Sequence, residues 1–248
     1  MAAGILLVPK DLKTGERRPV VVAQHGLEGT PKDVVEGDVG AYHDFAARLA
    51  DRGFVVFAPQ NPYRGGDRFR WLNKTANTVK LSMFSFIVAQ HDQILRWLAS
   101  LPFVDESRIG FYGLSYGGTT AMRVPSVLEG YALSICSANF NEDIYKTVST
   151  SHDFAYPFYR TWEVGFFNLG NTFGHAELAS LILPRPFMVE RGMHDTVGTD
   201  AWVSHEFGKV RWLYSQLGIG DRAVIEFFNL TAPTPSMARE PSRFSTAT

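Results

Sequence analysis

The chain has 248 residues, 45% of them hydrophobic and 20% charged, with a formal net charge of −1 and a pI near 6.7. This length fits one α/β domain with a sizeable core. The near-zero charge gives no electrostatic footprint of a protein that binds nucleic acid or an anionic membrane, so neither partner is expected, and it leaves small neutral substrates open. The apolar runs fall far short of the roughly 20 residues that span a bilayer.

The start of the chain and its cysteine content bear on its compartment. Residues 1–9 are too short and too uncharged for a secretory signal, so the chain as printed is expected to be cytoplasmic. An export signal in a longer parent protein, upstream of Met1, stays open. Cys136 is the single cysteine, which excludes an internal disulfide, and its apolar surroundings predict a buried strand thiol without a catalytic role.

Strand-like runs alternate with helical segments along the chain, which predicts an α/β fold with a mostly parallel sheet flanked by helices. The first two runs, 4–8 and 19–24, are joined by the turn-forming segment 13–16, so we expect a hairpin and an antiparallel start. The other expected strands are 54–58, 108–114, 132–137, 185–190 and 223–228. The expected helices are 42–52, 78–100, 119–128 and 202–217.

A glycine-containing loop, Ala23-Gln-His-Gly-Leu-Glu-Gly29, follows the second strand. A turn at this point can aim a backbone N–H at a pocket beyond the carboxyl ends of the strands, and the Leu27 amide is our candidate for an oxyanion-hole donor. His25 precedes the loop glycine. A histidine in that position more often hydrogen-bonds the backbone than acts as a base.

The stretch Gly113-Leu-Ser-Tyr-Gly117 stands between an expected strand and an expected helix and spells G-x-S-x-G. Its two glycines permit a strained strand-to-helix turn that lifts the Ser115 hydroxyl into solvent at a helix N-terminus. We therefore predict that Ser115 is a nucleophile and that the Tyr116 amide is the second oxyanion-hole donor.

Two segments supply candidate walls for a pocket. Residues 61–71 form an expected loop that offers Arg64, Arg68 and Trp71, with solvent-facing arginines as the alternative. Residues 138–183 lack periodicity and are rich in aromatic side chains, as expected of an irregular cap over a pocket, with a surface insertion that has its own small core as the alternative.

The loop Arg191-Gly-Met-His-Asp-Thr-Val197 places a carboxylate at the carboxyl end of a strand. A serine nucleophile needs a general base, and the base needs a carboxylate that fixes its tautomer. Asp195 is the predicted acid, with a turn or helix cap as its non-catalytic alternative. Asp200 and Glu190 are the other candidate acids.

These motifs give the chain a resemblance to the α/β-hydrolase superfamily, in its dienelactone hydrolase-like and acetyl-xylan-esterase-like branch, close to the catalytic domain of prolyl oligopeptidase. The resemblance covers nearly the whole chain and rests on His25-Gly26, the serine pentapeptide and Gly192-x-x-Asp195-x-Val197. It implies the α/β-hydrolase fold and cleavage of carboxylic esters through an acyl-enzyme, without a metal or organic cofactor. We expect a serine esterase for small or carbohydrate-linked acids.

The family places its catalytic histidine in a G-x-H-like turn after the last strand, before a closing helix. Residues 230–248 contain no histidine and are rich in Pro, Ser and Thr, so a disordered tail after a hydrolase domain over 1–229 is the direct interpretation. Read from the third base of each codon, the back-translated segment 231–244 permits Gly-Pro-His-Thr-Ile-Asn-Gly-Lys-Gly-Thr-Phe-Glu. A frameshift is the favoured explanation, and activity of the chain as printed is expected to be impaired.

The remaining histidines are poor substitutes for that base. His194 adjoins the acid in sequence, and His205 lies on a helix expected to pack outside the sheet. Four more fall on helices or in the insertion, where packing, capping or exposure is favoured: His43, His91, His152 and His175.

Two other interpretations of the chain stay open. One is a serine peptidase of the prolyl oligopeptidase type, although the expected upstream propeller domain is absent from this sequence. The other is a non-catalytic hydrolase fold that serves as a binding module. Loss of the closing helix also predicts an uncovered apolar face and self-association.

Overall fold

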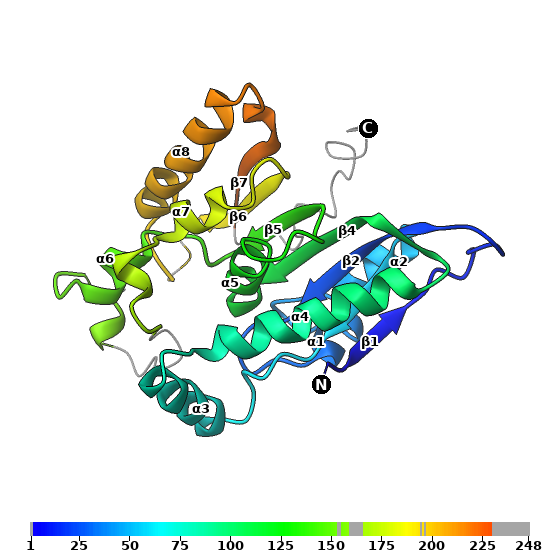
Figure 1. The fold of residues 1–248 in the computed structure, drawn as a ribbon, viewed down its shortest axis with the longest axis horizontal. Coiled ribbons are helices and arrows are strands. Elements are labelled where there is room, and N and C mark those ends of the chain that lie inside the picture. The colour runs from blue at the N-terminus through cyan, green and yellow to red at the C-terminus, as the bar shows by residue number, and fades with distance from the viewer. Residues whose placement is uncertain (1, 153–154, 159–165, 194, 196, 230–248) are drawn as a thin grey trace.

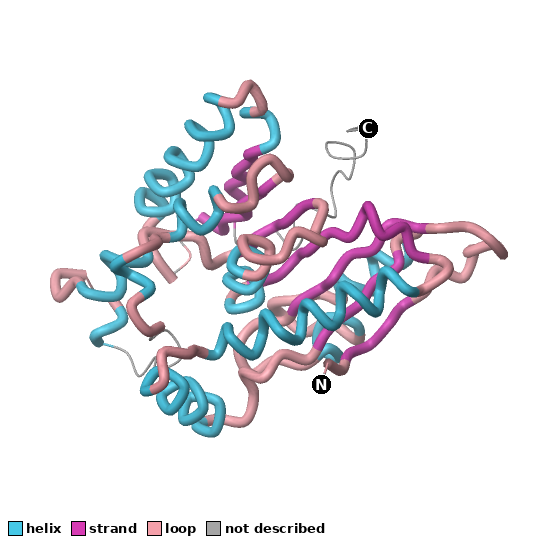
Figure 2. Tube along the Cα trace, in the orientation of Figure 1, coloured by secondary structure: helices cyan, strands magenta, loops and turns pink. Residues whose placement is uncertain are grey.

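The computed structural model describes residues 2–152, 155–158, 166–193, 195 and 197–229. Seven strands in this part of the chain form one sheet in the order β1-β3-β2-β4-β5-β6-β7 (Figures 1 and 2). β1 runs antiparallel to β3, and all other neighbours are parallel. The predicted α/β-hydrolase fold class is confirmed. The strands are β1 (Gly4–Leu7), β2 (Arg18–Gln24), β3 (Val55–Pro59), β4 (Val104–Leu114), β5 (Leu133–Ser137), β6 (Phe187–Met193) and β7 (Ala223–Asn229).

The predicted hairpin between the first two strands is wrong, although the antiparallel start is confirmed. β1 pairs with β3, where Ile5 lies opposite Ala58 and Leu6 opposite Phe57. β2 lies on the far side of β3 and pairs in parallel with β3 and β4. β2 is buried at five consecutive positions, which suits an interior strand, whereas β1 keeps partial exposure, which suits an edge.

Helices flank the sheet, and several of their bounds differ from the sequence prediction. The helix expected over 119–128 begins earlier, directly after Ser115, and spans Tyr116–Arg123. The helix expected over 78–100 starts later, at Met83, because the Ser82 hydroxyl accepts the Phe84 amide at 3.2 Å and caps it there. Part of the expected loop 61–71 is helical, and the insertion contains two short helices, α6 and α7. The helices are α1 (Pro31–Val35), α2 (Phe45–Asp51), α3 (Asp67–Thr78), α4 (Met83–Ser100), α5 (Tyr116–Arg123), α6 (Asp143–Val148), α7 (His175–Ser180) and α8 (Asp200–Gln216).

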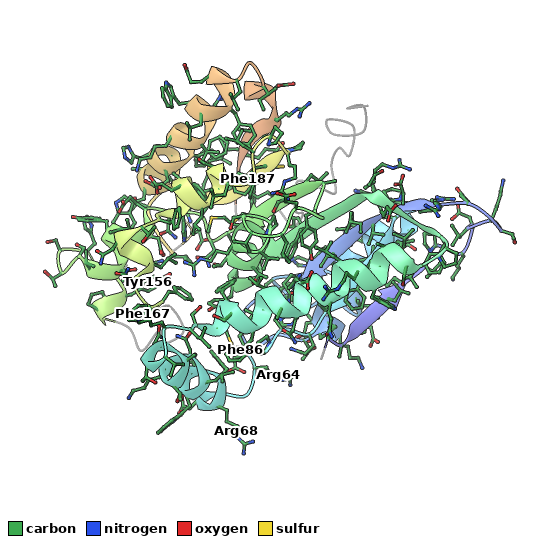
Figure 3. The ribbon with its side chains drawn as sticks, in the orientation of Figure 1. Arg64, Arg68, Phe86, Tyr156, Phe167 and Phe187 are labelled. Carbon is green, nitrogen blue, oxygen red and sulfur yellow. The ribbon has the colours of Figure 1, made fainter. Side chains whose placement is uncertain are left out.

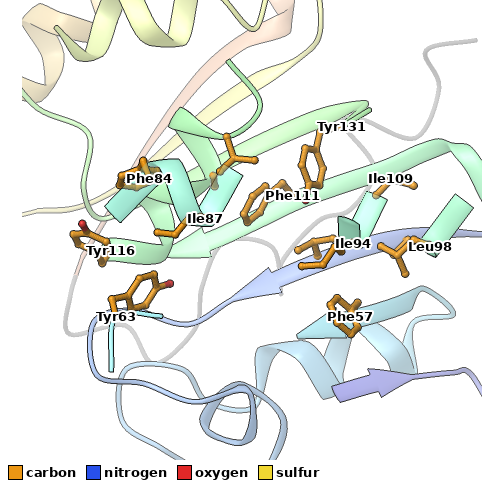
Figure 4. Close-up of a cluster of buried hydrophobic side chains, with 14 of the residues drawn as sticks. Phe57, Tyr63, Phe84, Ile87, Ile94, Leu98, Ile109, Phe111, Tyr116 and Tyr131 are labelled. Atoms are coloured by element: carbon orange, nitrogen blue, oxygen red, sulfur yellow. The ribbon is translucent and has the colours of Figure 1, made fainter. Parts of the chain in front are cut away.

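Alternating strand residues feed an apolar layer on each face of the sheet. On one face, Phe111 packs under α4 within the cluster of Figure 4, and Cys136 and Phe187 pack under α5, α7 and α8. On the other face, Tyr112 meets Phe45 of α2 in an edge-to-face contact with ring centroids 4.8 Å apart. Cys136 is a buried free thiol, as predicted.

The insertion is joined to the sheet domain by aromatic contacts. Phe166 meets Phe84 of α4 with ring centroids 5.6 Å apart. Figure 3 shows Tyr156 and Phe167 on the side of the molecule where α3 and α4 meet. The last part of the insertion belongs to the core, because Ala176, Leu178 and Ile182 are buried in the layer under α8.

On the face of the sheet that packs against α1 and α2, some apolar side chains near β7 are incompletely covered. Leu133 of β5 and Val224 of β7 are only partly buried there. Residues 230–248, on which the tail, the frameshift and the missing helix fall, lie outside the described residues. The domain boundary at 229 and self-association through this face therefore stay predictions. No helix in the described part of the chain is long and apolar enough to cross a membrane.

Candidate active site

Ser115 stands at the strand-to-helix turn between β4 and α5, as predicted. Its backbone angles are φ 60° and ψ −123°, a combination that non-glycine residues avoid. Its amide donates to the Ser137 carbonyl of β5 at 2.9 Å, and its carbonyl accepts the Thr119 amide at 3.1 Å. The side chain is partly exposed at the N-terminus of α5. The sheet and the helix therefore hold this strained residue in place from both sides.

Three glycines make the turn sterically possible. A Cβ on Gly113 would lie 2.1 Å from the Gly117 carbonyl oxygen, and a Cβ on Gly117 would lie 2.5 Å from the Gln24 carbonyl oxygen. Gly118, which the motif does not include, is equally constrained, because its Cβ would lie 2.4 Å from the Ser137 carbonyl oxygen. The helix α5 thus approaches the ends of β2 and β5 more closely than any side chain allows.

The loop after β2 packs directly on this turn. A Cβ on Gly26 would lie 3.1 Å from the Ser115 Cβ. The Gly26 amide donates to the Tyr42 hydroxyl oxygen at 2.9 Å, and the Glu28 amide donates to the Tyr63 carbonyl at 3.0 Å. The Leu27 amide between them has no hydrogen-bond acceptor within the described part of the chain. One unengaged donor therefore remains in the loop that touches the serine.

His25 fixes the shape of this loop. Its Nδ1 donates to the Gly26 carbonyl at 2.8 Å, and in that tautomer its Nε2 accepts from Gln60 Nε2 at 3.3 Å. The Tyr63 hydroxyl donates to the His25 carbonyl at 2.6 Å. Burial lowers the pKa of His25, so the ring is neutral at physiological pH. With both ring nitrogens engaged, His25 supports the backbone, as predicted, and is not placed to act as a base.

Tyr63 is a supporting residue that the motifs did not reveal. It is fully buried, and its ring meets those of His25 and Tyr116 edge to face at centroid distances of 5.2 and 4.8 Å. Figure 4 shows Tyr63 and Tyr116 at one end of the apolar cluster. The ring therefore packs against both segments that meet at Ser115. In the sequence it is one aromatic residue among many.

Asp195 follows β6, where the sequence predicted the acid. Its Oδ1 accepts the Val197 amide at 3.0 Å, and its Oδ2 lies 3.4 Å from Arg191 Nη1. Arg191 is buried at the end of β6, and its Nη2 donates to the Asp195 carbonyl at 2.9 Å and to the Gly198 carbonyl at 2.7 Å. One guanidinium therefore holds both the backbone and the carboxylate of this loop.

The two alternative acids are engaged elsewhere. Asp200, the first residue of α8, accepts Arg191 Nε at 2.9 Å. The buried Glu190 accepts the Tyr112 hydroxyl at 2.9 Å, which places its carboxylate in the layer under α1 and α2. Both carboxylates thus have structural contacts.

Each histidine of the described residues either contacts another group or is exposed. His91 is buried and its Nδ1 lies 2.7 Å from the Tyr131 hydroxyl, and His175 is buried with Nε2 3.4 Å from an Asp143 carboxylate oxygen. His205 is exposed on α8. His43 contacts Asp38, His152 contacts Tyr145, and His194 lies outside the described residues.

Residues 4–134 match the dienelactone hydrolase family. The chain belongs to the dienelactone hydrolase family. This confirms the resemblance to the dienelactone hydrolase-like branch of the α/β-hydrolases. The strand-to-helix turn at Ser115 and the loop after β2 lie within the matched residues, whereas Asp195 lies beyond them. No curated protein matches the chain by sequence.

Solved structures share the fold at low sequence identity. A Bacteroides fragilis protein assigned as an acetyl xylan esterase has a TM-score of 0.71 at 14% identity, covering 91% of this chain and 62% of its own. A Caldicellulosiruptor kristjansonii glucuronoyl esterase has a TM-score of 0.67 at 17% identity, and the match covers 95% of this chain and 69% of the esterase. A Pyrococcus horikoshii acylaminoacyl peptidase has a TM-score of 0.64 at 17% identity, and the match covers 97% of this chain and 37% of the peptidase. The chain thus spans under two thirds of the Bacteroides protein.

The three residues proposed from sequence as pocket walls lie on or just before α3. Arg64 and Arg68 are exposed, which is the alternative that the sequence left open, and Figure 3 shows Arg68 directed away from the sheet. Trp71 is 64% exposed on α3. The segment predicted as a loop is helical from Asp67 onward.

Proposed function

We propose that this chain is a serine hydrolase that cleaves carboxylic esters through an acyl-enzyme intermediate. The Ser115 hydroxyl attacks the ester carbonyl, and the Leu27 and Tyr116 amides stabilise the oxyanion of the tetrahedral intermediate. Asp195 orients the histidine that removes the serine proton. The observation that carries the proposal is the strained Ser115 packed against Gly26, beside the unengaged Leu27 amide.

Esters of small or carbohydrate-linked acids are the proposed substrates. Support comes from the family match and from structural likeness to proteins named as acetyl xylan and glucuronoyl esterases. The near-zero net charge is consistent with neutral ester substrates. The likeness to an acylaminoacyl peptidase covers only 37% of that enzyme, so it favours a peptidase less.

The general base is the component of the triad that no histidine of the described residues is suited to supply. We propose that it is the histidine encoded by the shifted reading frame after residue 229, and that the chain as printed is impaired. Support comes from the described histidines, of which His25 has both ring nitrogens engaged and His205 is exposed on α8. Removal of a triad histidine typically costs several orders of magnitude in kcat.

Hydrolysis of p-nitrophenyl acetate tests the proposal in three proteins: the printed chain, Ser115→Ala, and a chain that carries the restored C-terminus. We expect weak activity in the first, none above background in the second, and at least a 1000-fold gain in the third, since a complete triad is present only there. Equal activity in the first two would refute Ser115 as the nucleophile. Silence in all three would favour a non-catalytic binding module.

A further inference from the structure

We propose that Lys146 is a positioning residue, which holds the acid loop, defined as Asp195 and residues 197–199, through the main chain at Val197. This inference rests on the proposed role of Asp195 as the acid. It concerns a residue of the insertion, whereas the serine turn, the loop after β2 and the acid all belong to the sheet domain.

The contacts of Lys146 lead directly to the acid. Its Nζ donates to the Val197 carbonyl oxygen, and the Val197 amide donates in turn to Asp195 Oδ1 at 3.0 Å. The ammonium group thus fixes one polar group of Val197 while the Asp195 carboxylate binds the other. A displacement of Val197 would therefore remove a hydrogen bond from the carboxylate.

Burial of this lysine needs a compensating interaction. Lys146 is only 2% exposed, and lysines are almost never so deeply buried unless they are paired. Burial lowers its pKa to about 8, while the Asp143 and Asp195 carboxylates act in the opposite direction. The group is therefore mostly charged at neutral pH. Its Nζ also lies 4.6 Å from the ring centroid of Tyr156 in the insertion.

The helix that carries Lys146 is anchored through its first residue to the nucleophile helix. Asp143, one turn before Lys146 on α6, lies 3.5 Å from Arg123 Nη2 and 3.4 Å from His175 Nε2. Arg123 ends α5, the helix that begins beside Ser115, and its guanidinium carbon lies 4.0 Å from the Phe166 ring centroid. The short helix α6 therefore links the nucleophile helix to the acid loop.

Lys146 and Arg191 of β6 bind different carbonyls of the acid loop. Arg191 binds the carbonyls of Asp195 and Gly198, and Lys146 binds the intervening carbonyl of Val197. Loss of Lys146 would leave the loop bound to Arg191 but would remove the hydrogen bond that ties Val197 to the insertion. The position of the carboxylate relative to Ser115 would then be less defined, and catalysis is sensitive to such displacements.

Hydrogen exchange of the Val197 amide, followed by NMR in Lys146→Met, tests the inference without requiring activity. We expect about tenfold faster exchange at Val197, with unchanged exchange at Val22 in the central strand β2, which reports global unfolding. The control Lys10→Met removes an exposed lysine of the loop after β1 and should change neither amide. Unchanged exchange at Val197, or equal acceleration at Val22, would overturn the inference.

A second measurement covers the case in which Lys146→Met does not fold. In Asp195→Asn, NMR titration of the Lys146 ammonium should show a pKa below its value in the parent chain, because one attracting carboxylate has been neutralised. An unchanged pKa would contradict the connection between the two groups.

Kinetics separate this inference from the proposed function. The kinetic test uses the chain that hydrolyses esters, whether printed or with the restored C-terminus. In that chain Lys146→Met should lower kcat about tenfold with KM unchanged, and Lys10→Met should leave both unchanged. Faster exchange at Val197 with normal kcat would refute the positioning role. If neither chain hydrolyses esters, the proposed function fails, and the exchange result alone decides whether Lys146 holds the loop.

Discussion

Gly117→Ala should destabilise the protein by about 3 kcal/mol, at the upper end of the range for overpacking. The new Cβ would lie 2.5 and 2.6 Å from the carbonyl oxygens of Gln24 and His25. Neither oxygen can retreat easily, because Gln24 is paired with β4 and the His25 carbonyl accepts the Tyr63 hydroxyl at 2.6 Å. In a chain of this length, about 3 kcal/mol corresponds to a fall in Tm of roughly 6–12 °C.

Gly208→Ala is the matched control for this prediction. Gly208 lies within α8 and a Cβ there meets nothing within 4 Å, so alanine should stabilise the helix by up to about 1 kcal/mol. Urea unfolding of both variants beside the parent chain gives the comparison. A Gly117→Ala protein as stable as the parent would show that α5 can move away from β2, and the close-approach argument would fail.

Three further outcomes follow from buried groups. Burial lowers the pKa of His91 from its usual 6.5 to about 3, so the unfolded state takes up the proton first; stability is full above pH 6.5 and falls by about 2 kcal/mol at pH 5. The non-titrating His91→Gln should lose correspondingly less between pH 7.5 and 5 in urea unfolding, and parallel pH profiles would contradict this. Burial raises the pKa of Cys136 to about 12, so a disulfide reagent should label the native protein far more slowly than the unfolded one. Comparable labelling rates would disprove its burial. Tyr63→Phe removes the donor to the His25 carbonyl and should cost about 1–2 kcal/mol, measured as a lower denaturant midpoint, and an unshifted midpoint would show that the bond contributes nothing.

The sequence was most informative where one local pattern dictates one backbone geometry. The run before Ser115 is buried on both faces, and the glycines around it have no alternative to a tight turn, so both the strand and the turn were predicted correctly. The turn at Gly26 was predicted equally well, because it follows a buried strand. Such positions need no knowledge of distant contacts.

Pairing between strands that are distant in the sequence was predicted less well. The segment 13–16 has the composition of a hairpin turn, yet β1 pairs with β3, because pairing depends on which strand is buried rather than on the turn alone. The helices α6 and α7 have six residues each, too few to show a period. Lys146 looked like any surface lysine, since only the folded chain brings it to Val197.

The conformation of Ser115 has a consequence for the stability of this chain. A residue at φ 60° and ψ −123° is strained by roughly 1–3 kcal/mol unless it is glycine. Ser115→Gly should therefore yield a protein that is more stable and lacks the proposed nucleophile. Under the proposed function, the serine is kept at a cost in stability, because only its hydroxyl can attack the ester.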